Sequence, residues 1–176
     1  MQSQDLKLNL GCGEKRYPHH INIDKAPLIQ ADLLWDLEKT PIPLKTDSVS
    51  EVICEHILEH ITNLIPLLEE IHRICKPGAK IFVSAPYYKY EAAYRDPTHV
   101  RFFTEHSFDY FQDDVKFSHY SEARFKVINV ELKNHFFSSV KNLHKKIIRF
   151  VPFKKILNHF MWNMFSEINY ELEVIK

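Results

Sequence analysis

The stretch LKLNLGCG at residues 6–13 decides the fold of this chain. Leu6–Leu10 is an apolar run typical of a β-strand, and Gly11 and Gly13 follow it directly. The chain of 176 residues contains only three glycines, so most of them lie in this one turn. Glycine adopts positive φ angles and lets a ligand approach the backbone. Because open α/β sheets bind small ligands at the carboxyl ends of their strands, this stretch predicts a ligand-binding loop on such a sheet.

Further strand-like and helix-like runs alternate along the sequence. An amphipathic helix is predicted over Leu64–Lys76, where apolar residues recur every three or four positions before the break at 76–78. A shorter helix is predicted over 104–111. The alternation indicates a Rossmann-like α/β domain with a mostly parallel sheet and an antiparallel last strand near an edge. The predicted strands are Leu6–Leu10, Ile21–Ile23, Val49–Cys54, Lys80–Ser84, Phe125–Glu131 and Ile168–Ile175.

Composition and charge exclude several classes of protein. Hydrophobic residues make up 45% of the chain and aromatic residues 13%, which is typical of a globular protein rather than a disordered one. The formal net charge is +0, so no overall field favours nucleic acid. The three cysteines form no CxxC pair, which argues against a disulfide framework and a structural zinc site. We expect a cytoplasmic protein, since neither a signal peptide nor a membrane-spanning run is present.

The spacing after the glycine turn excludes two common nucleotide-binding motifs. A dinucleotide fingerprint needs a third glycine three residues after Gly13 and an acidic residue about 20 residues further on. In this sequence Arg16 stands where the third glycine should be, and the acidic residue, Asp24, comes too early in the chain. A phosphate-binding P-loop is also absent, because no Gly-Lys-Ser/Thr sequence exists.

Five segments in order resemble the class I S-adenosylmethionine-dependent methyltransferases, in particular the small LNLGCG-type members. They are LNLGCG at 8–13, INID at 21–24, ADL at 31–33, CEHILEHI at 54–61 and IHRICKPG at 71–78. The resemblance implies a Rossmann-like, mostly parallel sheet of seven or slightly fewer strands, with an antiparallel last strand and helices on both faces. It also implies methyl transfer from S-adenosylmethionine to a small-molecule, glycan or lipid-linked acceptor.

The resemblance further implies a role for each matching residue in binding the cofactor. Asp24 would accept hydrogen bonds from the ribose hydroxyls, and Asp32 would meet the adenine amino group. Two positions depart from the family's pattern: Asn9 replaces a common acidic residue, and Lys15 replaces a third glycine of the loop. The cofactor-binding residues implied in this way are Asn9, Gly11, Cys12, Gly13, Asp24, Asp32, Leu33, Glu55 and His56.

A polar segment after the Lys80–Ser84 strand is predicted to form the acceptor site. It contains Asp96, His99 and Arg101 and follows Tyr87, and we predict that these four residues bind the acceptor. His99 is the candidate catalytic base, because imidazole titrates near neutral pH. Asp96 and His99 could equally hold the loop together. His56 and His60 have a metal-binding spacing, but without a third ligand nearby in the sequence we predict no metal site.

A basic segment, residues 132–166, carries seven Lys or Arg and no Asp or Glu. We expect a single domain over 1–176 with a helical insertion at about 134–166, which acts as a packing element or lid, or touches an anionic membrane. Its aromatic residues are arranged like the core-facing side of a helix rather than like exposed rings on which bases stack, so we expect no nucleic acid as a partner. An alternative function is a catalytically silent, methyltransferase-like module that binds a partner or membrane surface through 132–166.

Overall fold

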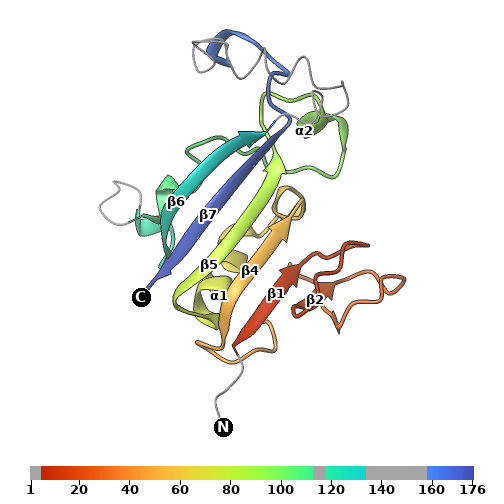
Figure 1. Cartoon of the computed structure of the whole chain (residues 1–176), viewed down its shortest axis with the longest axis vertical. Helices are drawn as coiled ribbons and strands as arrows, with labels where there is room; N and C mark the ends of the chain where they lie inside the picture. The colour runs from red at the N-terminus through yellow and green to blue at the C-terminus, as the bar shows by residue number, and fades with distance from the viewer. Residues whose placement is uncertain (1–4, 113–117, 134–157) are drawn as a thin grey trace.

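A computed structural model describes residues 5–112, 118–133 and 158–176 of the chain. Its centre is one seven-stranded sheet with the order β3-β2-β1-β4-β5-β7-β6 (Figure 1). Strands β1 to β5 are parallel to one another, and β7 runs antiparallel between β5 and β6. The predicted sheet is therefore confirmed, with β6 rather than the last strand at the edge. The strands are β1 Leu6–Leu10, β2 Ile21–Asp24, β3 Leu33–Leu34, β4 Val49–Glu55, β5 Cys75–Pro86, β6 Arg124–Lys133 and β7 Glu167–Ile175.

Among the helices that lie wholly within the described residues, all are short apart from α1, Leu64–Ile74. The helix predicted from Leu64 thus forms, but it ends before Cys75, which is extended and begins β5. The helix predicted over 104–111 is wrong in its first half, which forms turns. There the Ser107 hydroxyl accepts the Thr104 N–H at 2.8 Å, a local bond that competes with helix formation. The remaining helices are η1 Leu58–His60, α2 Ala92–Arg95, η2 Asp109–Phe111 and η3 Ser118–Tyr120.

One face of the sheet is apolar and carries α1. Strand residues that face it lie in register across the sheet, for example Leu8 beside Val52, Val52 beside Ile81, and Ile81 beside Leu172. All four are buried and belong to one hydrophobic core, together with the inner residues of α1. Side chains alternate between the two faces of a strand, so this register sends the polar residues of the same strands to the opposite face.

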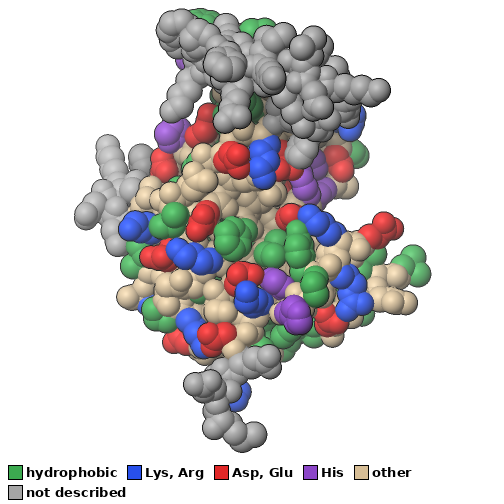
Figure 2. Space-filling model, viewed as in Figure 1, with side chains coloured by type: hydrophobic (Ala, Val, Ile, Leu, Met, Phe, Trp, Pro, Cys, Tyr) green, Lys and Arg blue, Asp and Glu red, His purple; other side chains and the backbone are tan. Residues whose placement is uncertain are grey.

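The opposite face is polar and carries ion pairs. Lys80 Nζ lies 2.7 Å from Glu173 across β5 and β7, and Lys7 Nζ lies 3.2 Å from Glu51 across β1 and β4. Figure 2 shows oppositely charged side chains interspersed over the side turned to the viewer. The connections between β1, β2 and β3 are too short to place helices on this face, so the described residues put the long helix on the apolar face alone.

Most of the predicted insertion, residues 134–157, lies outside the described residues. The described end of the basic segment contacts the domain: Asn158 Nδ2 donates to the Tyr87 hydroxyl at 2.8 Å, and Lys89 Nζ donates to the Asn158 carbonyl at 2.5 Å. Within the described part of the chain, no helix has the length and apolar character needed to cross a membrane.

Candidate active site

The glycine loop after β1 is held against the end of β2. Gly11 and Gly13 have positive φ angles of 63° and 49°. The Cys12 N–H donates to the Ile23 carbonyl at 3.0 Å, and the Gly13 N–H donates to Asp24 Oδ2 at 2.9 Å. These bonds direct the turn toward the carboxyl end of β2, where the fold class places ligands.

A cavity of about 360 Å³, named cavity A here, opens beside this loop. Two carboxylates and several apolar side chains line it. Its volume falls within the range of small-molecule sites. The lining residues are Gly11, Asp24, Lys25, Trp35, Asp36, Leu37, Ile57, His60, Ile61 and Thr98.

Asp24 lines cavity A and is fixed in place by backbone hydrogen bonds. Its Oδ2 accepts the Gly13 N–H and its Oδ1 accepts the Ala26 N–H, each at 2.9 Å. A carboxylate has about four acceptor positions, so two backbone bonds orient the group and leave lone pairs for a ligand. Asp24 can therefore accept hydrogen bonds from a pair of hydroxyl groups.

Asp32 and Asn9 form hydrogen bonds with other residues of the protein, and neither lines cavity A. Asp32 Oδ2 accepts the Asn22 N–H at 2.8 Å, while its Oδ1 accepts from Arg16 at 2.5 Å. These bonds to Asn22, followed by the charge of Arg16, lower the pKa of Asp32. Asn9 is 2% exposed and donates to Lys15 O at 2.8 Å and to Asn22 Oδ1 at 3.0 Å.

Asp36 and Trp35 stand in cavity A where the sequence analysis placed Asp32. The reason is β3, which the sequence pattern did not reveal. Asp32 precedes Leu33–Leu34, whereas Asp36 follows it and so lies at the carboxyl end of the strand. An acidic residue after a strand, rather than before it, is the signal that could have found Asp36.

Four other expected cofactor residues do not line cavity A: Gly13 and Cys12 belong to the loop itself, and Glu55 and Leu33 lie in neighbouring strands. Glu55 ends β4 and pairs with Lys15, whose Nζ lies 2.6 Å from the carboxylate. This contact raises the pKa of Lys15. Cys12 is 5% exposed, and burial raises the pKa of its thiol. Leu33 lies in β3 and packs against the core.

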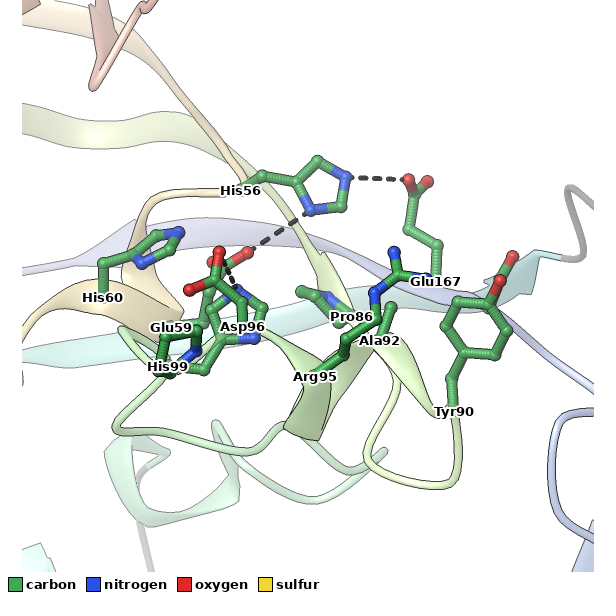
Figure 3. Close-up of a pocket in the computed structure, with 12 residues that line it drawn as sticks. His56, Glu59, His60, Pro86, Tyr90, Ala92, Arg95, Asp96, His99 and Glu167 are labelled. Atoms are coloured by element: carbon green, nitrogen blue, oxygen red, sulfur yellow. Dashed lines mark hydrogen bonds and ion pairs between the residues drawn. The ribbon is translucent and has the colours of Figure 1, made fainter.

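A second cavity of about 770 Å³, named cavity B here, adjoins the ends of β4, β5 and β7 (Figure 3). His56 belongs to this cavity rather than to cavity A. Its Nε2 lies 3.1 Å from Glu167 and its Nδ1 lies 3.3 Å from Glu59. These two carboxylates, Glu167 foremost, raise the pKa of His56 to about 9. Tyr90, Arg95 and Glu167 also line cavity B, and the sequence analysis did not single them out.

Two of the four expected acceptor residues, Asp96 and His99, line cavity B, and two do not. Tyr87 is 1% exposed, and its hydroxyl donates to Glu105 at 3.1 Å. Burial raises the pKa of this hydroxyl. Arg101 points away and donates to the carbonyl groups of residues 61 and 62.

His60 lies in the walls of both cavities. Its Nδ1 is 2.9 Å from the hydroxyl of Thr98, which is another wall residue of cavity A. Cavity A offers apolar walls and hydroxyl-binding carboxylates, while cavity B offers imidazoles, carboxylates and a guanidinium. Two ligands can therefore meet at His60, one in each cavity.

Comparison with known proteins identifies the same fold. Residues 8–83 match the family described as a methyltransferase domain. No curated protein sequence matches the chain. The solved structure of an S-adenosylmethionine-dependent methyltransferase from Archaeoglobus fulgidus is similar, with a TM-score of 0.65 and 16% identity over 96% of this chain and 86% of that one.

Two further solved structures are also similar. A methyltransferase from Mesorhizobium loti has a TM-score of 0.58 and 13% identity over 98% of this chain and 93% of that one. Phosphoethanolamine N-methyltransferase 2 from Haemonchus contortus, solved with S-adenosyl-L-methionine, has a TM-score of 0.59 and 12% identity over 100% of this chain and 50% of that one. The resemblance inferred from the sequence is thereby confirmed.

Proposed function

We propose that this chain, which has the fold of the class I S-adenosylmethionine-dependent methyltransferases, transfers a methyl group to a small-molecule, glycan or lipid-linked acceptor. One observation carries the proposal: cavities A and B meet at His60. A group-transfer enzyme needs such a junction, because donor and acceptor must be held next to each other.

The residues of cavity A fit the nucleoside part of S-adenosylmethionine. Asp24 is oriented by backbone N–H groups and keeps lone pairs for the two ribose hydroxyls. Trp35, Leu37 and Ile57 provide apolar wall for the adenine ring, and Asp36 is an acceptor for its amino group. When bound, the cofactor supplies a methyl group on a sulfonium, which is already activated for transfer.

Cavity B is proposed to hold the acceptor with its reacting group near His60. His99 Nδ1 lies 3.0 Å from the Ala93 carbonyl, to which it can donate only when it carries the proton. That tautomer leaves Nε2 free to take a proton from an acceptor hydroxyl. Asp96, whose pKa is lowered by its bonds from Thr98, remains a carboxylate and can accept a hydrogen bond from a polar acceptor.

Transfer of a radiolabelled methyl group tests the function directly. The protein is incubated with S-adenosylmethionine labelled in the methyl group and with small-molecule, glycan and lipid fractions of a cell extract. We expect label to enter one fraction, and Asp24→Asn to reduce this transfer strongly. Absence of transfer to every fraction would overturn the proposal.

A further inference from the structure

Three side chains of metal-binding type converge where the two cavities meet. They are Glu59 and His60, which are adjacent in η1, and His99 from the loop after α2. One potential ligand atom of each lies within 4.8 Å of the others. Figure 3 shows the carboxylate between the two imidazole rings.

The hydrogen bonds of both histidines leave the same nitrogen free. His99 Nδ1 donates to the Ala93 carbonyl at 3.0 Å. His60 Nδ1 lies 2.9 Å from the Thr98 hydroxyl, which donates its own proton to Asp96 Oδ1 at 2.7 Å and so accepts from His60. In the neutral rings each Nε2 therefore carries a lone pair. Donation from the other nitrogen to a carbonyl or hydroxyl is the usual arrangement in metal-binding histidines.

Glu59 is buried without a hydrogen-bonding partner for its carboxylate. The residue is 1% exposed, and within the described residues neither carboxylate oxygen accepts a hydrogen bond. Its backbone carbonyl, in contrast, accepts the N–H groups of Val100 and Arg101. Apart from its ion pair with His56 at 3.3 Å, this buried carboxylate is left with unused acceptor positions, which is costly and indicates a further ligand.

Carboxylates gather around the imidazoles of this cluster. His56 lies 3.3 Å from Glu59 and 3.1 Å from Glu167, so Glu59 shares its ion-pair partner with a second carboxylate. Asp96 brings another carboxylate to the cluster, with Oδ2 3.8 Å from His99 Nε2. Carboxylates and imidazoles in this mixture are the ligand types of a transition-metal site.

We propose that Glu59, His60 and His99 bind one divalent transition-metal ion through a carboxylate oxygen and two Nε2 atoms. Two imidazoles and one carboxylate suit zinc and its first-row neighbours, whereas magnesium and calcium prefer oxygen ligands. Ligand atoms of a tetrahedral zinc site lie about 3.3 Å apart, given metal–ligand distances of about 2.0–2.1 Å. The three groups lie within 4.8 Å of one another, so binding would require the side chains to close this spacing.

The sequence analysis predicted no metal because His56 and His60 lacked a third ligand nearby. The fold turns His56 toward Glu167 and brings His99, 39 positions after His60, into the cluster instead. Binding of a cation would occupy the Nε2 lone pair of His99, so the metal would then polarise an acceptor group in place of proton removal by this residue. The site itself does not depend on methyl transfer.

Zinc binding to the full chain tests the proposal. The protein is treated with a chelator, dialysed and titrated calorimetrically with zinc chloride. We expect one equivalent to bind. Glu59→Gln and His99→Asn should each weaken binding by at least about tenfold, since loss of even a ligand's hydrogen-bonding partner costs about 10–100-fold. The control is His106→Asn, which removes an exposed histidine paired with Asp109 at 2.8 Å outside the cluster and should bind zinc as the wild type does.

Unfolding in urea separates a metal ligand from a merely structural residue. Without zinc, Glu59→Gln loses a buried charge and also the ion pair with His56, so each protein is compared with its own zinc-free form. Zinc should raise the free energy of unfolding of the wild type and leave that of Glu59→Gln nearly unchanged, because a ligand of the folded state alone stabilises that state. Absence of one-equivalent binding, or equal zinc affinity in Glu59→Gln and the wild type, would overturn the proposal.

Discussion

Gly11 and Ile57 lie so close together that a β-carbon on Gly11 would stand 2.3 Å from Cγ1 of Ile57. Gly11 follows β1 and Ile57 follows β4, so the contact joins the ends of two adjacent strands. Both residues line cavity A. Glycine is therefore required at this position for two independent reasons. The backbone has a positive φ of 63°, and Ile57 fills the space that a β-carbon would need.

This contact predicts that alanine substitutions at Gly11 and Gly13 differ in how much they destabilise the protein. Gly13 also has a positive φ, 49°, but a β-carbon there would meet nothing within 4 Å. Gly13→Ala should lower the free energy of unfolding by about 1–2 kcal/mol, the cost of the left-handed conformation alone. Gly11→Ala should cost more in urea denaturation, and Ile57→Ala should recover part of that loss. Equal losses for the two glycines would contradict the packing argument.

Sequence patterns predicted the sheet well because its strands alternate between a buried and a polar face. Leu8, Val52 and Ile81 are buried as their positions in apolar runs indicate. The two residues of β3 are too short a run to show any period, and without that strand Asp32 was singled out and Asp36 was not.

The junction between the cavities could not be read from the sequence. Its geometry depends on the loop after α2 folding back over η1, where the N–H groups of Val100 and Arg101 reach the Glu59 carbonyl. These bonds join positions about 40 residues apart, and no local pattern encodes them. The same folding turns Arg101 away from cavity B, although His99, two positions earlier, lines that cavity.

Asp36 and Asp32 should differ in their effect on the cofactor. Asp36→Asn should weaken S-adenosylmethionine binding by about 1–3 kcal/mol, the range for a hydrogen bond to a charged group. Asp32→Asn should change affinity much less, because Asp32 is bonded to Asn22 and Arg16 outside cavity A. Calorimetric titration of both variants measures the difference. A larger loss for Asp32→Asn would restore the assignment made from the sequence.

Asp32 should also make stability depend on pH at the acidic end. Hydrogen bonds from Asn22 hold its pKa below its ordinary value of 3.8, so the folded protein binds the proton less tightly than the unfolded chain. The stabilisation is present above pH 3.8 and is lost as pH falls through the folded-state pKa. Urea denaturation of the wild type and Asp32→Asn should show a difference at pH 6 that shrinks below about pH 4. A constant difference would exclude this linkage.

The three cysteines should react slowly with thiol reagents while the protein is folded. Burial raises the pKa of Cys54 and Cys12, and it raises that of Cys75 to about 12. Since the thiolate is the reactive form, labelling at pH 8 should be far slower in buffer than in urea. Mass spectrometry of the labelled peptides would show this, and rapid native labelling of Cys54 would contradict its burial.

The most direct test of the account is the affinity of S-adenosylmethionine for the wild type and for Asp24→Asn, measured by calorimetry. Asp24 lines cavity A with both oxygens already oriented by backbone N–H groups. The account predicts that the wild type binds one equivalent and that Asp24→Asn binds about 1–3 kcal/mol more weakly. The control variant Asp109→Asn, changed outside both cavities, should bind as the wild type does. Equal affinity for Asp24→Asn and the wild type would contradict the account.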